Sequence, residues 1–253
     1  MRQIRTNNMK LIALDSSGLV ASVAIVEDDN LLAEYTINYK KTHSQTLLPM
    51  LDQIANMIEL DLKEIDAVAV AKGPGSFTGL RIGSATAKGL GLALNKPIIE
   101  VPTVDGMAYQ LYGVTDLICP LMDARRGQVY TGIYRFSNDK AKSSFETVMP
   151  QCAVSIEELI AKCNELGERV VFLGDGVPVH RQLLTEQLDV SHEFAPAYCN
   201  RQRASAVAAL AQIYFERGGF VSAADHAPDY LRLSQAERER KEKEAADGKA
   251  DKA

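Results

Sequence analysis

Residues 72–83, with the sequence KGPGSFTGLRIG, join an apolar run to a segment rich in small residues. The apolar run, AVAVA at 67–71, is typical of a buried parallel strand. Gly73, Pro74 and Gly75 break that strand, and Ser76 is a favourable N-cap for a helix. A strand, a glycine turn and a helix in this order indicate an α/β protein, in which such turns often hold a phosphate or a partner.

The spacing of the glycines argues against two common phosphate-binding motifs. A P-loop requires Lys and then Ser or Thr after its last glycine, but Gly79 is followed by Leu80 and Arg81. A dinucleotide fingerprint requires Gly-x-Gly-x-x-Gly, and the interval from Gly75 to Gly79 is one residue too long. Two interpretations stay open: a ligand loop, or a tight turn followed by close helix packing.

Composition sets further bounds on function. The chain has 253 residues, of which 46% are hydrophobic and 24% charged, so it can form one large domain or two small ones. Its net charge of −5 argues against a basic nucleic-acid binder acting alone, and we expect any RNA contact to be local or through a partner. The four cysteines show no Cys-x-x-Cys spacing. Because we find no long apolar run and no signal sequence, we expect a cytoplasmic location and no membrane contact.

The two halves of the chain repeat one order of elements. In the first half we predict three strands, the last two at 20–26 and 31–37, followed by a helix at 44–60, the strand at 67–71, a helix at 76–94 and a strand at 98–101. The second half also opens with an apolar strand that ends in an aspartate, Asp123 in place of Asp15. We predict that strands at 128–136 and 145–149, a capped helix at 155–166, and a strand at 169–173 with its glycine turn follow it. The repeated order of elements indicates a duplication, the alternative being chance similarity of two ordinary α/β units.

The two helices around the glycine loop carry more apolar and small residues than one core requires. The first has apolar residues beyond its core-facing stripe, and the second carries several glycines, each of which costs about 0.8 to 1 kcal/mol in a helix relative to alanine. We therefore predict that both helices form a protein-protein surface as well as a core, the alternative being burial in a tight α/β layer. The candidate partner-binding residues are Leu48, Met50, Ala55, Met57, Gly79, Gly83, Ala87, Leu90 and Leu94.

Few side chains point to chemistry. Asp15 and Ser16, at the end of the first strand, and the turn Gly174, Asp175, Gly176 are candidates for binding a nucleotide phosphate, although such turns often only bond their own amides. The four histidines lack the spacing of a metal pair on a helix, and we find no Gly-x-Ser-x-Gly nucleophile motif. We identify no catalytic residue, no metal ligand and no firm cofactor site.

Five motifs together resemble one known family. They are Asp15 with its two serines, HSQTLLP at 43–49, the glycine stretch at 73–83, MDARRGQVY at 122–130, and Pro228-x-Tyr230-x-Arg232. From about Met9 to Arg232 the chain resembles the TsaB (YeaZ) family of bacterial tRNA threonylcarbamoyladenosine biosynthesis proteins. The resemblance implies an α/β fold of two tandem actin-like (ASKHA, RNase H-like) subdomains, each with a mixed five-stranded sheet flanked by helices.

The resemblance also implies a role without catalysis. TsaD, the catalytic relative in this superfamily, carries a His-x-x-x-His metal pair after the corresponding strand, whereas residues 101–110 here contain no histidine. The family therefore implies a scaffold subunit that binds TsaD, works with TsaE, forms a homodimer and meets tRNA through the complex. It would have no cofactor of its own, because ATP or ADP and the metal ion belong to the partner complex.

Some features leave other functions open. Gln128 stands where members of the family often have Glu, which weakens any inference about a ligand near Asp123. An ATP-dependent phosphotransferase of the sugar or acetate kinase type is the main alternative, and an M22-type metallopeptidase is a more remote one. We expect an N-terminal extension at 1–8, subdomains at 9–103 and 104–233, and a charged, disordered tail at 234–253. The helix at 203–217 is free to pack back on the first subdomain.

Overall fold

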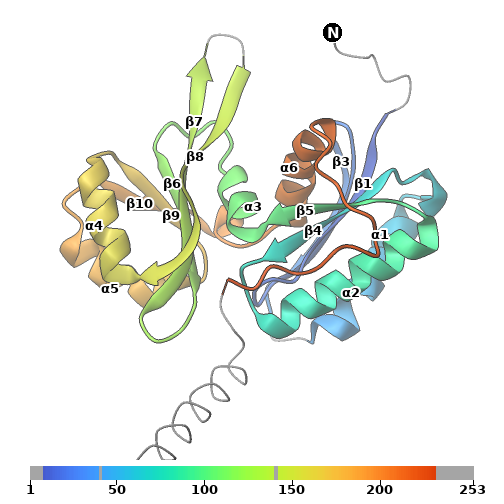
Figure 1. The fold of residues 1–253 in the computed structure, drawn as a ribbon, viewed down its shortest axis with the longest axis horizontal. Coiled ribbons are helices and arrows are strands. Elements are labelled where there is room, and N and C mark those ends of the chain that lie inside the picture. The colour runs from blue at the N-terminus through green and yellow to red at the C-terminus, as the bar shows by residue number, and fades with distance from the viewer. Residues whose placement is uncertain (1–7, 40–41, 140–141, 232–253) are drawn as a thin grey trace, which may run out of the picture.

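The computed structural model describes residues 8–39, 42–139 and 142–231. The expected N-terminal extension, apart from residue 8, and the expected tail lie outside these ranges, as does Arg232. Within them, the chain forms two five-stranded sheets, and helices cover both faces of each sheet (Figure 1). The predicted mixed five-stranded sheets are confirmed.

The first sheet has the strand order β3-β2-β1-β4-β5. β1 pairs antiparallel with β2 and parallel with β4, which pairs parallel with β5. The strands are β1 (Lys10–Asp15), β2 (Ala21–Glu27), β3 (Asn30–Ile37), β4 (Ala67–Gly73) and β5 (Ile98–Pro102).

Alternation along β1 explains how this sheet is covered. Ile12 and Leu14 face one core with α1 (His43–Met57) and α2 (Phe77–Leu94). Leu11 and Ala13 face the other core with α6 (Ala204–Glu216). Because successive side chains of a strand point to opposite faces, a strand buried on both sides reads as one continuous apolar run. Within the described residues, the final helix, α6, thus packs on the first sheet.

The second sheet has the order β10-β9-β6-β7-β8 and repeats the pairing of the first. Its strands are β6 (Leu117–Asp123), β7 (Gln128–Asp139), β8 (Lys142–Ser155), β9 (Val170–Leu173) and β10 (His192–Phe194). One face packs on α4 (Ile156–Leu166) and α5 (Gly176–Gln187), and the other on α3 (Thr103–Tyr109). α3 and α6 contact each other and lie between the two sheets (Figure 1).

The structure adds elements that the sequence pattern did not show. α3, α5, β10 and two 3-10 turns, η1 (Leu62–Glu64) and η2 (Ala197–Cys199), were not predicted, and β8 is much longer than the strand expected at 145–149. The capping box of α4 is present as predicted, with Ser155 and Glu158 bonding each other's backbone. No helix among the described residues is long and apolar enough to span a membrane.

Candidate functional site

The turn after β1 holds a buried carboxylate. Asp15 is 1% exposed, and its Oδ1 accepts hydrogen bonds from the Ser17 backbone N–H (2.9 Å) and the Ser17 hydroxyl (2.6 Å). Burial disfavours the charged form and raises the pKa of Asp15 to about 6, although both bonds from Ser17 act to lower it. The Asp15 side chain is therefore near its titration midpoint under mildly acidic conditions.

The glycine loop packs directly on this turn. The Ser76 N–H donates to the carbonyl O of Ser17 (2.6 Å), and the Ser16 hydroxyl donates to the carbonyl O of Gly79 (2.9 Å). A Cβ atom added at Gly75 or Gly79 would lie 2.2 or 2.1 Å from a carbonyl oxygen of Ser17 or Ser16. Only glycine allows this approach of two backbones. Of the two interpretations left open by the sequence, close packing within the chain accounts for these glycines.

Other segments surround the same turn. His43, the first residue of α1, places its Nε2 2.9 Å from the carbonyl O of Gly18. Gln202, just before α6, lies against Gly18 and is 1% exposed. His43 Nδ1 and Gln202 Nε2 are buried, and neither has a hydrogen-bond partner within the described part of the chain. The turn is thus enclosed by α1, the glycine loop and the segment that leads into α6.

The second glycine turn is built in a similar way in the other half. Gly174 has a φ of +112°, and a Cβ atom there would lie 2.0 Å from the carbonyl O of Leu121. Asp175 accepts a bond from the Asp123 N–H (3.2 Å), and burial raises the pKa of its carboxyl. The Gly174 N–H is taken by Asn200, and Gly176 begins α5. Hydrogen bonds within the chain thus hold four of the candidate phosphate-binding residues, Asp15, Ser16, Gly174 and Asp175.

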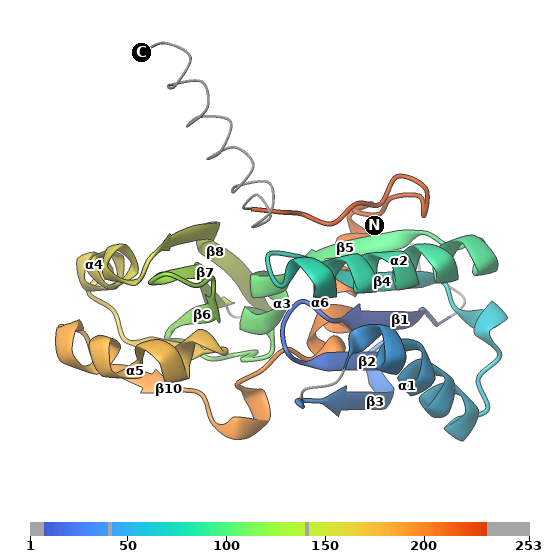
Figure 2. The ribbon, with the colours of Figure 1, turned by 90° about the horizontal axis from the view of Figure 1, so that it is seen from below.

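A segment that sequence reasoning did not place covers the glycine loop. Residues 219–231, which we call the C-terminal strap, run beside β5 and α2 (Figure 2). The Asp229 N–H donates to the carbonyl O of Lys72 (2.7 Å), and the Tyr230 ring lies 4.6 Å from the Phe77 ring. The motif Pro228-x-Tyr230 was the one available signal, but nothing in its pattern indicated that it would lie on the glycine loop.

The candidate partner-binding residues divide into two groups. Five of them are buried within the chain, because their helix faces pack on the first sheet or on the Asp15 turn: Met50, Ala55, Gly79, Gly83 and Ala87. These five side-chain positions are closed to a partner in this structure. Leu48 and Met57 are exposed, at 51% and 76%, and Leu90 and Leu94 are half-buried.

The outer face of α2 carries small residues that the candidate set did not include. Ala85, Gly89 and Ala93 are exposed and follow one another at intervals of four residues, so they form one row along the helix. Leu92 beside them is 64% exposed. Apart from the neighbouring backbone of α2 itself, no atom of the described residues lies within 4 Å of a Cβ atom placed at Gly89. We call this surface the α2 outer row.

Among the described residues, no group of three or more His, Cys, Asp or Glu side chains could hold a metal ion.

Comparison with known proteins identifies the relatives of this chain. A family model described as TsaD, tRNA N6-adenosine threonylcarbamoyltransferase, matches residues 30–240. The chain is 34% identical over 232 residues to the tRNA threonylcarbamoyladenosine biosynthesis protein TsaB of Bacillus subtilis, which covers 90% of this chain and 96% of that protein. TsaB of Haemophilus influenzae is 30% identical over 240 residues, with coverages of 89% and 94%.

A solved structure has the same fold. YeaZ from Pseudomonas aeruginosa superimposes with a TM-score of 0.74 at 24% identity, covering 88% of this chain and 100% of that one. Together with the two sheets of equal topology, this confirms the expected fold of two tandem actin-like units.

Proposed function

Because the chain belongs to the TsaB (YeaZ) family of tRNA threonylcarbamoyladenosine biosynthesis proteins, we propose that it is the non-catalytic scaffold subunit of the complex that forms this nucleoside. In this proposal it binds TsaD and, with TsaE, supports transfer of the threonylcarbamoyl group from threonylcarbamoyl-AMP. The acceptor is N6 of the adenosine next to the anticodon in tRNAs that read codons starting with A. ATP or ADP and the metal ion belong to the partner complex, tRNA is met through that complex, and the reaction is cytoplasmic.

The packing of the glycine loop is the main observation behind a non-catalytic role. In a phosphate-binding loop the backbone amides point at the ligand. Here the Ser76 N–H is taken by Ser17 and the Gly79 N–H by the Ser76 hydroxyl. The C-terminal strap bonds to Lys72 at the start of the same loop. Residues 101–110 also lack the histidines that TsaD carries in this region.

The α2 outer row supports the docking part of the proposal. A row of Ala and Gly lets a second backbone approach closely, and Leu92 adds apolar area that a partner would bury. Leu48 and Met57 add exposed apolar area on α1, which packs against α2. We propose this surface for TsaD and for the homodimer, in place of the five positions that are buried.

The docking surface is tested by Ala93→Arg, which places a long cation on the α2 outer row. The matched control is Ala161→Arg, at an exposed alanine of α4 in the other half. We expect Ala93→Arg to weaken binding to TsaD at least tenfold, about 1.4 kcal/mol, and Ala161→Arg to leave binding unchanged. Isothermal titration with purified TsaD measures both, and circular dichroism verifies that each variant is folded. Equal binding of the two variants would remove the α2 outer row from the proposal.

The subunit role is tested by reconstitution. Tritiated threonine incorporation into tRNA is followed with this chain, TsaD, TsaE, ATP, bicarbonate and the enzyme that supplies threonylcarbamoyl-AMP, leaving out one component at a time. We expect incorporation to be lost without this chain. Full incorporation in its absence would overturn the proposal. If the chain alone hydrolysed ATP and Asp15→Asn abolished this activity, the phosphotransferase would be supported instead.

A further inference from the structure

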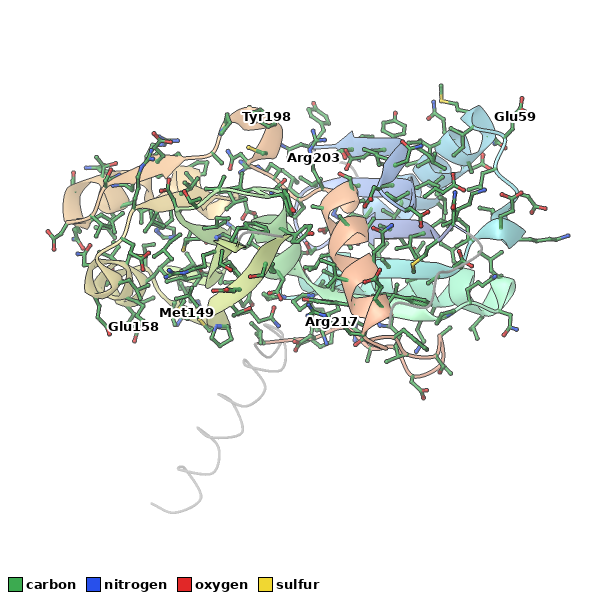
Figure 3. The ribbon with its side chains drawn as sticks, turned by 90° about the horizontal axis from the view of Figure 1, so that it is seen from above. Glu59, Met149, Glu158, Tyr198, Arg203 and Arg217 are labelled. Carbon is green, nitrogen blue, oxygen red and sulfur yellow. The ribbon has the colours of Figure 1, made fainter. Side chains whose placement is uncertain are left out.

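A cavity of about 440 Å³ lies where the end of α3, the turn η2 and the start of α6 meet, away from the glycine loop. Tyr109, Tyr112 and Tyr198 form aromatic walls, and the small residues Ala206 and Ala209 form the side along α6. Tyr198 and Arg203 lie side by side at its rim (Figure 3). The volume falls in the range of small-molecule sites, about 300 to 1,000 Å³.

The cavity contains an amide without partners. Gln110, the C-cap residue of α3, lines it, and both amide atoms of this side chain are shielded from solvent and make no hydrogen bond to the residues that the structure describes. A buried polar group left unpaired costs about 1 to 3 kcal/mol. A Gln amide offers one acceptor and a donor side by side. A ligand that presents a hydrogen-bond donor next to an acceptor would therefore satisfy both atoms of this amide.

The rim carries no uncompensated charge for a phosphate. Arg203 pairs with Glu34 (2.7 Å), whose other carboxylate oxygen accepts from the Ser205 hydroxyl (2.7 Å) and backbone N–H (3.1 Å). The Glu34 carboxylate thus pairs with the arginine and bonds the first turn of α6, which lowers the positive potential at the rim. An uncharged ligand fits this electrostatic environment better than an anion.

We propose that this cavity binds the adenine base of an uncharged adenine nucleoside. Its walls stack on the base, since aromatic side chains bind the faces of nucleobases at about 1 to 3 kcal/mol per base. The Gln110 amide pairs with the base edge: Oε1 accepts from the 6-amino group and Nε2 donates to a neighbouring ring nitrogen, the pairing by which Gln reads adenine. The Tyr112 ring is held by ring contacts with Tyr109 and Phe136, whereas Tyr198 is 73% exposed. Because the amide atoms lie below the cavity surface, the pairing requires a side-chain movement at the rim, and Tyr198 has the room to make it.

The test is equilibrium dialysis of the full chain alone against radiolabelled adenosine. Three ligands separate the contribution of the 6-amino group from that of a phosphate. They are adenosine, purine riboside, which lacks the 6-amino group, and AMP, which adds a phosphate. We expect adenosine to bind with a Kd at or below about 1 mM, purine riboside to bind at least tenfold more weakly, and AMP to gain nothing over adenosine.

Two variants and their matched controls locate the site. Gln110→Leu and Tyr198→Ala should each weaken adenosine binding at least tenfold. Gln182→Leu, on α5, and Tyr39→Ala, at an exposed tyrosine beyond β3, should not change it. The proposal fails if adenosine does not bind, if purine riboside binds equally well, if AMP binds more tightly, or if the controls weaken binding as much as the cavity variants. None of these outcomes bears on complex formation with TsaD.

Discussion

Gly89 and Gly91 lie two residues apart in α2 and have opposite surroundings. Beyond the backbone of α2, a Cβ atom at Gly89 meets no described residue within 4 Å. A Cβ atom at Gly91 would lie 2.9 Å from the Cβ of Ala223 in the C-terminal strap and 3.1 Å from the Lys96 carbonyl O. We predict that Gly89→Ala stabilises the isolated chain by about 0.8 to 1 kcal/mol, because alanine is the better helix former. Urea denaturation measures the change.

Gly91→Ala serves as the contrast in the same experiment. There the propensity gain is offset by a clash that forces the strap to move, and overpacking of this kind costs about 1 to 3 kcal/mol. We therefore expect a lower unfolding midpoint for Gly91→Ala than for the parent chain. Equal effects of the two substitutions would mean that helix propensity alone governs α2.

The raised pKa of Asp15 predicts that the free energy of unfolding depends on pH. Its folded pKa of about 6 lies above the ordinary value of 3.8, because burial disfavours the carboxylate. The contribution of this group is therefore fully present below about pH 4 and is lost as the pH rises through 6. Asp15→Asn keeps an oxygen for the two Ser17 donors and has no charge. We expect Asp15→Asn to raise the free energy of unfolding by about 1 to 3 kcal/mol at pH 7.5.

Urea unfolding at pH 4 and at pH 7.5 tests this prediction. Most of the gain should disappear at pH 4, where Asp15 is protonated in the folded chain and partly protonated in the unfolded chain. Asp52→Asn, at an exposed position of α1, is the matched control and should be neutral at both pH values. If Asp15→Asn gave the same gain at both pH values, the raised pKa of Asp15 would not be its cause.

Which glycines face a partner is beyond what residue types can show. The sequence predicts a helix with many small residues, and that helix exists, but Gly79 and Gly83 pack on the Asp15 turn while Gly89 is open. The direction of each face depends on the phase of α2 relative to the sheet, which is set by long-range packing with Ser16 and Val70. The kind of element was predictable, and its outward face was not.

At the scale of elements, the C-terminal strap is fastened to the first half by a buried histidine. The His226 side chain is 0% exposed, and its Nδ1 lies 2.7 Å from Glu100 Oε1 on β5. Lys88 of α2 donates to the carbonyl O of His226 (2.9 Å). We predict that His226→Ala lowers the free energy of unfolding by about 1 to 3 kcal/mol, since it removes a hydrogen bond to a charged partner.

The same substitution should loosen the strap locally. We expect limited proteolysis to cut within residues 219–231 faster in His226→Ala than in the parent chain, because local opening exposes the backbone. His192→Ala, on β10 of the other half, should not change cleavage there. Unaltered cleavage of the strap in His226→Ala would show that its other contacts suffice.

Element prediction from the sequence succeeded where the pattern was strong. Buried strands such as β4 and the capped helix α4 carry local signals, an apolar run and a Ser-x-x-Glu cap. α3 has only seven residues, α5 begins inside a glycine turn and contains Pro178, and three-residue β10 is too short for periodicity. The strap has no regular structure for most of its length, so only tertiary contacts place it.

At the scale of the whole molecule, one carboxylate connects the two halves. Asp105 of α3 accepts from the Tyr134 hydroxyl of β7 (2.6 Å) and the Tyr214 hydroxyl of α6 (3.2 Å). Tyr134 belongs to the second core, whereas Tyr214 packs with the core of the first sheet. The duplication was predictable from the repeat, and the actin-like fold from the family resemblance. This connection was not predictable, because the three residues come from three elements far apart in the sequence.

We predict that Tyr134→Phe destabilises the chain by about 1 to 3 kcal/mol at pH 7.5, because it leaves a largely buried carboxylate without one donor. Burial raises the pKa of Asp105 and the two tyrosines lower it, so removing Tyr134 raises that pKa further. A raised carboxyl pKa means stability that is present at low pH and lost as the pH rises, and the cost of Tyr134→Phe should therefore shrink at pH 4.

A double-mutant cycle with Tyr214→Phe completes this prediction. Loss of both hydroxyls raises the pKa of Asp105 more than either single loss, and access to the neutral form limits the cost of the buried charge. The double variant should thus lose at least about 0.5 kcal/mol less than the sum of the two single variants at pH 7.5. Strict additivity in urea denaturation would mean that the two tyrosines act independently and that Asp105 does not couple the halves. A non-additive cycle would show that the first and second sheets share one titrating group, so that their stabilities change together with pH.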